Sequence, residues 1–272
     1  MKGFVDWMVE QIFVGYLDTV TNALTTNIFV GEFAPAWEYV AKIMNDILIP
    51  IGCSLMVIYF LVALIDKSSS GQFNFESFFK CFIQLVVATL LVTNLIDIIN
   101  IILSVGYVLI GQAADTVGSG AVAADLVQEA KDKLWANGDG FFTQLGNLAV
   151  VLFPFIMSFI VRLGVLLVAY TRIFELMVTT MFMPMSMGDI FTEGLHGAAM
   201  RNIKRLLAVS LQGFGVYAVC VLFSRIQNGI LTTYTEWTDF FTIAGTVIVL
   251  GFSCLATCFK VLPMIKDALG VH

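Results

Sequence analysis

Long apolar stretches with almost no charge recur along the chain, over residues 47–65, 82–96, 145–161, 206–223 and 240–259. A hydrocarbon core about 30 Å thick needs roughly 20 apolar residues of helix to cross it. Lipid offers the backbone no hydrogen-bond partner, so each stretch must satisfy its own N–H and C=O groups as a helix. The pattern therefore predicts an all-α, polytopic integral membrane protein with about five transmembrane helices.

The second span is the least regular of the five. Its helical pattern begins near Phe75 and continues to about Gly111, which is longer than a bilayer is thick. Asn94, Asp97 and Asn100 recur every third residue within it, so we expect its second half to leave the membrane or to face a wet cavity. The other spans are predicted at about 44–65, 145–183, 203–223 and 240–261.

Outside the spans, apolar residues at the N-terminus recur at helical spacing and predict an amphipathic helix on the membrane surface. Its polar face is acidic, with Asp6 and Glu10, so packing on protein is the alternative. A polar segment lies between spans two and three and contains a short predicted helix. The chain is thus divided into an N-terminal segment at 1–40, two spans at 41–111, an external segment at 112–144, and three spans with a short tail at 145–272.

Composition agrees with a membrane protein, since 59% of the residues are hydrophobic and 12% are charged, against about 25% charged in soluble domains. The net charge of −6 argues against a general nucleic-acid binder. Cys254 and Cys258 are one helical turn apart and could serve a metal, but no acidic residue or histidine lies near them in sequence. Packing is favoured there, as it is for the methionines at 181–187, and no metal ligand is assigned.

Basic residues give an orientation. The cluster Arg201, Lys204 and Arg205 is expected to be cytoplasmic, because short cytoplasmic loops carry excess Lys and Arg. Five spans with the N-terminus outside and the C-terminus in the cytoplasm satisfy this rule. A hairpin at Arg162 would give six spans and place the cluster outside, so five spans are preferred.

Charged residues inside the apolar regions need a functional or structural explanation, because placing an Arg at the bilayer centre costs about 2.5–3.5 kcal/mol on insertion scales. Asp97, Arg162, Arg172 and Glu175 are the candidates. Arg172 and Glu175 are three positions apart and can pair on one helix face. Two interpretations stay open, a water-lined or gating contact and an interhelical ion pair near the inner interface.

Two further groups concern contacts with other molecules. Lys131, Lys133 and Trp135 could touch a nucleic-acid strand, although the acidic residues around them favour a solvated helix. Gly213 and Gly215 in span four, with Gly245 and Gly251 in span five, permit close helix approach and point to self-assembly. The chain has no nucleotide-binding loop and no nameable catalytic triad or carboxylate pair, so we do not expect an enzyme.

The stretch Tyr170-Thr-Arg172-Ile-Phe-Glu175-Leu-Met, continuing to Pro184, is followed by a loop and then Arg201-Asn-Ile-Lys204-Arg205. This region, and the order of surface helix, two spans, external segment and three spans, resembles the TrbL-like family. Its members are polytopic inner-membrane subunits of type IV secretion and conjugation machines. The resemblance runs from about residue 40 to 265, and the short tails are similar to versions from Gram-positive conjugative elements.

The resemblance implies a ring of about five or six copies in the cytoplasmic membrane that forms a conduit for single-stranded DNA with attached protein. The expected partners are other inner-membrane secretion subunits, separate ATPases and membrane lipids. No cofactor is implied, although bound phospholipid is compatible with such a ring. The external segment with Lys131, Lys133 and Trp135 would be linked to substrate passage. The alternative is a small-solute or ion transporter, monomeric or dimeric, whose route is lined by Asp97, Arg172 and Glu175; a lytic pore is less favoured.

Overall fold

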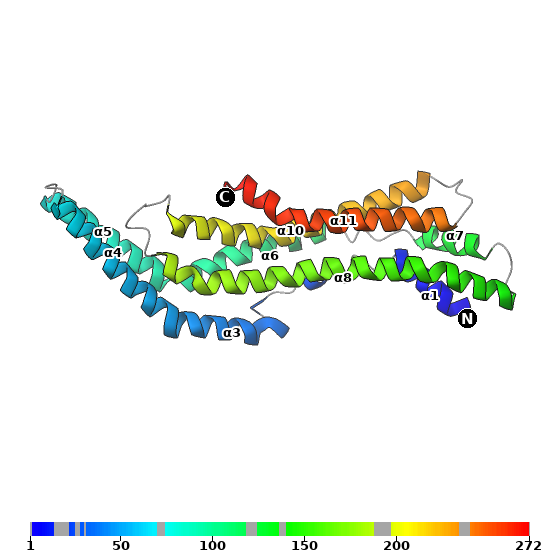
Figure 1. Cartoon of the computed structure of the whole chain (residues 1–272), viewed down its shortest axis with the longest axis horizontal. Coiled ribbons are helices and arrows are strands. Elements are labelled where there is room, and N and C mark those ends of the chain that lie inside the picture. Colours follow the sequence, from blue (N-terminus) through cyan, green and yellow to red (C-terminus); the bar gives the residue numbers. More distant parts are fainter. Residues whose placement is uncertain are drawn as a thin grey trace. The chain divides into compact units, whose positions relative to one another are not determined.

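A computed structural model describes residues 2–13, 22–24, 28–29, 31–69, 74–117, 124–135, 140–187, 197–233 and 240–271. Within these ranges the chain is helical almost throughout and contains no strand, which confirms the all-α fold. The α-helices, labelled in Figure 1, are α1 (Lys2–Phe13), α3 (Ala34–Ile43), α4 (Ile49–Ser69), α5 (Phe75–Thr93), α6 (Leu95–Val117), α7 (Ala124–Leu134), α8 (Phe141–Ser186), α10 (Ala198–Thr233) and α11 (Phe240–Ala268).

Five helical stretches of the described chain are long and apolar enough to cross a membrane, as predicted. They are Ala34–Ser69, Leu95–Thr116, Phe141–Ser186, Ala198–Gly229 and Thr242–Ala268. The most apolar window of Ala198–Gly229 is 61% buried, against 17–28% for the others. Most of the span surface is therefore free to meet lipid or neighbouring subunits, and α10 is the most enclosed helix.

The region of the third span is one continuous helix of 46 residues, α8. At 1.5 Å per residue it is about 70 Å long and exceeds the bilayer. No hairpin occurs at Arg162, so the six-span alternative loses its basis.

The second predicted span is divided at Asn94. Its side-chain Nδ2 donates to the carbonyl of Leu90 at 2.8 Å, and its backbone leaves the helical conformation (φ −99°, ψ 17°). An Asn side chain that bonds the preceding turn competes with the helical ladder. The expected continuous helix at 75–111 is therefore wrong. It is replaced by α5, which contains the shorter apolar stretch Phe78–Thr93, and by α6, which begins at Leu95.

The first span also carries a local irregularity. A π-helical turn, η2 (Met44–Leu48), joins α3 to α4, and the N–H of Ile49 bonds the carbonyl of Met44 five residues back. Pro50 follows and has no N–H to bond the carbonyl four residues before it, so the ladder is interrupted at this point. Beyond it α4 packs beside α5 (Figure 1), where Lys67 Nζ donates to Cys81 Sγ at 3.0 Å.

The residues group into two compact units, each built from separate pieces of the chain. One unit contains residues 1–25, 109–171 and 213–262, and the other contains 26–108, 172–212 and 263–272. Helices α6, α8, α10 and α11 each contribute residues to both. The four consecutive segments expected from the sequence are a division along the chain, whereas these units are a division in space.

In the first unit, the N-terminal helix packs on protein. Val5, Met8, Val9 and Ile12 are fully buried in a cluster with α7, α8 and α11. The rest of the predicted N-terminal segment at 1–40 is described only in part, because residues 14–21, 25–27 and 30 lie outside the described ranges. The acidic polar face of α1 explains why the helix packs on protein and not on the membrane surface, because acidic residues are not attracted to anionic lipid.

Candidate functional site

A polar node joins α6, α8 and α10 in the second unit. Arg172 is 2% exposed, and its guanidinium donates from Nε to the carbonyl of Val209 and from a terminal nitrogen to that of Ser210, both at 3.1 Å. The guanidinium carbon lies 5.6 Å from the ring centroid of Tyr107 on α6. Main-chain dipoles and an aromatic face thus stabilise a buried cation, as in other cation–π contacts.

The same node depends on a close helix approach. Ser210 Oγ donates to the carbonyl of Ile102 at 3.2 Å, which ties α10 to α6. A Cβ built on Gly106 would contact Ser210 Oγ and would lie 2.7 Å from the Ser210 carbonyl oxygen. Only glycine allows the two backbones to come this near. Gly106, Tyr107 and Ser210 were not predicted from the sequence. For Gly106 and Ser210, the available signal was a small residue within a run of bulky apolar residues.

Glu175 lies one turn beyond Arg172 but pairs with other helices. Its Oε1 lies 3.4 Å from Arg205 of α10 and 3.5 Å from Lys266 of α11. The pairing of Arg172 with Glu175 that their spacing permitted is thus replaced by interhelical contacts for both. The structure supports the ion-pair interpretation for Glu175, whereas Arg172 is held by carbonyl groups.

The ion-paired carboxylate lies beside a basic cavity. Arg201, Asn202, Arg205, Lys266 and Val271 line a space of about 420 Å³ in the second unit. Two members of the predicted cluster, Arg201 and Arg205, therefore meet Lys266 from another span, while Lys204 is half-buried on the same turns of α10. We call Arg201, Arg205 and Lys266 the basic rim. Its cations outnumber the one carboxylate that the described contacts bring to it.

In the first unit, the predicted substrate-segment residues are engaged by the N-terminal helix. Trp135 Nε1 donates to Asp6 Oδ1 at 2.7 Å, and its ring lies 5.0 Å from Lys2 Nζ. Lys131 Nζ is 3.4 Å from Glu10 Oε1. The acidic face of α1 thus meets this part of α7, and both residues have a structural use. The side chain of Lys133 lies outside the described part of the structure.

The two remaining charge candidates lie in different settings. Arg162 on α8 donates to the side-chain oxygen of Gln11, with N–O distances of 3.2 and 3.3 Å, and to its carbonyl at 3.2 Å. This contact fastens α1 to α8 beside a cavity of about 160 Å³. Asp97 is exposed in the first turn of α6, where a carboxylate interacts favourably with the helix dipole.

The predicted packing glycines are found in mixed settings. Gly213 and Gly251 are buried, and Gly215 is half-buried. At Gly245 an added Cβ would meet no described atom within 4 Å. Besides Gly106, tight contacts occur at two further positions that the sequence did not single out. A Cβ on Gly52 would lie 2.6 Å from the Pro184 carbonyl oxygen, and one on Gly164 would lie 2.7 Å from Leu255.

Gly245 belongs to a stripe of small and hydroxylated residues on α11. These residues share one face at helical spacing and are exposed or half-buried: Thr242, Gly245, Thr246, Ser253, Ala256 and Thr257. We call them the α11 stripe; Val249 interrupts it. Its hydroxyls at 246, 253 and 257 donate to carbonyls one turn earlier in α11. Small residues of this kind let a second helix approach closely in a membrane.

The methionines at 181–187 do not gather on one side of their helix, whereas Cys254 and Cys258 lie beside a third cysteine. The methionines at 181–187 alternate, and successive members of an alternating set point to opposite sides of a helix; Met183 is buried whereas Met185 is 40% exposed. Cys254 and Cys258 instead gain a third thiol, because α10 brings Cys220 to them. That third ligand came from another span and could not be paired with them from the sequence.

Comparison with protein families gives one finding. The model of a family described as "TrbL/VirB6 plasmid conjugal transfer like protein" matches residues 31–184, which is more than half of the chain. That match includes α3 to α7 and all but the end of α8, with the buried Arg172 and the half-buried Glu175. A comparison with curated proteins gave no match, and neither did one with solved structures.

Proposed function

The chain belongs to the TrbL/VirB6 family of plasmid conjugal transfer proteins, and we propose that several copies assemble into a membrane conduit of the transfer machine. Membership makes it a component of a conjugal transfer system; the conduit and its assembly from identical copies are the proposal. The substrate is single-stranded DNA with attached protein, as the family resemblance implies. Separate ATPases would supply the energy.

The α11 stripe is the observation that carries the self-assembly. Its residues lie away from the buried face of α11, which contains Ile243, Val247, Cys254 and Cys258. Its exposed positions offer a neighbouring helix close van der Waals contact and hydroxyl groups, which drive helix association in lipid. A ring requires the stripe of one copy to pack on a different face of the next copy, because contact between two equivalent stripes would give a two-fold dimer.

The contact between α1 and α7 supports the proposed topology. Both helices lie on the same side of the membrane if they touch, so the chain between them crosses an even number of times. The two candidate spans in that interval, Ala34–Ser69 and Leu95–Thr116, satisfy this condition. With α1 and α7 outside, α8 runs inward, and the first turns of α10 with Arg201 and Arg205 lie at the cytoplasmic face, as the positive-inside rule requires.

The basic rim then has a use in the assembly. In a ring of copies, Arg201, Arg205 and Lys266 recur around the axis on the cytoplasmic side. A collar of this charge raises the local concentration of a polyanion and speeds its arrival. DNA phosphates are the anions that a transfer substrate brings.

The transporter alternative gains no support from the contacts of its three residues. Asp97 is exposed at the start of α6, Arg172 is buried against carbonyl groups, and Glu175 is ion-paired at the basic rim.

Replacing Ala256 with leucine tests the proposal. Ala256→Leu fills the α11 stripe with a bulky side chain, so the purified protein should lose its large assembly and donor cells should transfer DNA less often. Phe259→Leu, at an exposed aromatic residue next to the stripe, is the matched control and should change neither. An Ala256→Leu protein that keeps the wild-type assembly and transfer frequency would remove the stripe from the interface.

A further inference from the structure

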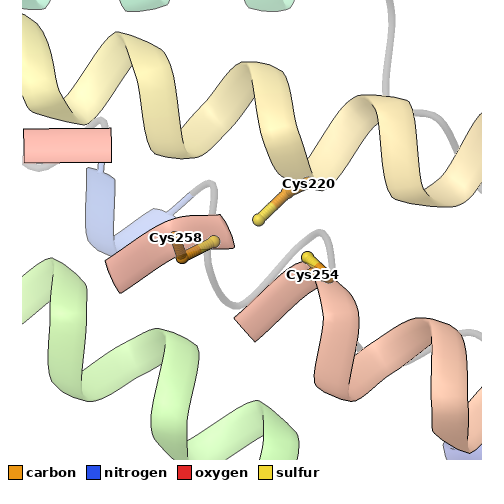
Figure 2. Close-up of side chains that lie close together, drawn as sticks. All are labelled: Cys220, Cys254 and Cys258. Carbon is orange, nitrogen blue, oxygen red and sulfur yellow. The ribbon is translucent and has the colours of Figure 1, made fainter. Parts of the chain in front are cut away.

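Three cysteines from two spans meet in the first unit. Cys220 comes from α10, and Cys254 and Cys258 come from successive turns of α11. All three are buried, and their Sγ atoms lie within 4.8 Å of one another. Figure 2 shows the side chains directed toward one another in the space between the two helices. Three thiols this close together can bind one metal ion in common, which isolated buried cysteines cannot do.

We propose that Cys220, Cys254 and Cys258 form a trigonal site for one soft monovalent metal ion, Cu(I). The separation of the sulfur atoms fits such an ion. A metal–sulfur distance of about 2.3 Å in a planar trigonal arrangement puts the sulfurs about 4 Å apart. Small rotations of the cysteine side chains would close the present spacing to that value.

The number of ligands selects the ion. Within the described part of the chain, the group holds three cysteines and no fourth histidine, cysteine or carboxylate. Structural Zn²⁺ is almost always four-coordinate and would need another ligand. Thiolate ligands favour Cu(I), which is stable with two or three sulfur donors. Hard cations such as Mg²⁺ and Ca²⁺ are excluded because they require oxygen ligands.

The net charge of the occupied site matters, because the site lies in apolar membrane-spanning helices, where an uncompensated charge is costly. Cu(I) that displaces one thiol proton to solvent leaves the site neutral, with one thiolate and two thiol ligands, and no change of oxidation state is involved. The bound ion would cross-link α10 to α11 and stabilise this hairpin, because it binds the folded state alone.

An entry path reaches the site in a chain whose α11 stripe is uncovered, because Ser253 and Thr257 belong both to the stripe and to the groove. A groove of about 210 Å³ lies between α10 and α11, with Cys254, Ser253 and Thr257 on one side and Val219, Phe223 and Ile226 on the other. Cys254 is therefore the thiol through which an incoming ion would be handed to Cys220 and Cys258. Its neighbours in the groove are hydroxylated or apolar, so the cysteines are the strongest ligands there.

The test uses the full chain, purified in mild detergent without oxygen and supplied with Cu(I) or, in parallel, Zn²⁺. We expect one copper per chain to survive desalting and competition with the chelator bicinchoninate. X-ray absorption should show a shell of three sulfur atoms. Cys220→Ser, Cys254→Ser and Cys258→Ser should each weaken copper binding roughly tenfold or more, while Cys53→Ser, at a cysteine outside the group, should leave it unchanged.

Because a serine variant can fail to fold, each titration is accompanied by size-exclusion chromatography and by circular dichroism of the helices. The X-ray absorption measurement on the unaltered chain needs no variant and tests the site by itself. The proposal is overturned if the unaltered chain retains no copper, if Zn²⁺ binds more tightly than Cu(I), or if Cys53→Ser loses as much copper as Cys254→Ser. None of these results bears on assembly of the chain, so the site and the proposed conduit are tested separately.

Discussion

Arg172 on α8 donates from its Nε to the main-chain carbonyl of Val209 on α10, 3.1 Å away. A second donor of the same guanidinium reaches the next carbonyl, that of Ser210. One buried side chain therefore binds two successive carbonyls of a neighbouring span. Its planar fork of donors suits this arrangement, whereas a lysine presents a single ammonium point.

Substituting Arg172 should destabilise the protein strongly. Arg172→Lys loses the two-point contact, and Arg172→Ala loses both hydrogen bonds and leaves space in the node. Hydrogen bonds to charged groups contribute about 1.5–3 kcal/mol each, so we expect a clear fall in the thermal unfolding midpoint for both. Lys260→Ala, at an exposed lysine on α11, is the control. Equal midpoints for the Arg172 and Lys260 variants would contradict the role of the node.

Gly106 should tolerate no side chain. In Gly106→Ala the new Cβ would contact Ser210 Oγ and the Ser210 carbonyl, so α6 and α10 would have to separate and the unfolding midpoint would fall. Gly111→Ala, in the same helix, is a matched control because nothing described lies within 4 Å of its added Cβ. Alanine is favoured over glycine in a helix by about 1 kcal/mol, so this control should be neutral or stabilising. Two variants of equal stability would argue against the close approach.

Glu175→Gln is predicted to have a small effect on stability. The carboxylate pairs with Arg205 and Lys266, but the side chains of the three residues are 23–48% exposed. Ion pairs of this exposure contribute about 0–1 kcal/mol. The thermal midpoint should therefore shift far less than in the Arg172 variants. A loss as large as that of Arg172→Ala would mean that the ion pairs stabilise the protein as much as the carbonyl contacts do.

Trp135→Phe should loosen the N-terminal helix without unfolding the protein. The change removes the donor to Asp6 but keeps an aromatic ring near Lys2. We expect faster hydrogen exchange in residues 2–13, with exchange in α10 unchanged. Trp7→Phe, at a residue that is 46% exposed, should leave α1 protected. Unaltered exchange in the Trp135 variant would show that the bond from Trp135 to Asp6 does not hold α1 in place.

Much of the fold could be predicted from the sequence because membrane spans depend on local properties. Length and hydropathy give the number of candidate spans, five, and the position of four of them, whereas the second lies at Leu95–Thr116 and not over 75–111. The break at Asn94 was visible only as a polar period with Asp97 and Asn100. Whether such residues line a cavity or end a helix depends on the bond that Asn94 makes to its own backbone, which the pattern does not reveal.

The candidate site was less predictable because its contacts join different helices. The spacing of Arg172 and Glu175 suggested a pair, but three-dimensional packing gave carbonyl partners to one and Arg205 and Lys266 to the other. Trp135 and Asp6 both stood out by type, yet their separation in the chain concealed their contact. The same holds for Cys220, which joins Cys254 and Cys258 only when α10 and α11 pack.

The central claim is that several copies of this chain form one conduit, and native mass spectrometry of the full chain in mild detergent tests it most directly. The account predicts a single species of about five or six copies, a closed ring of identical subunits. Retained phospholipid would be compatible with that ring. A monomer or dimer as the only species would contradict the homomeric conduit and favour a transport path contained within one chain.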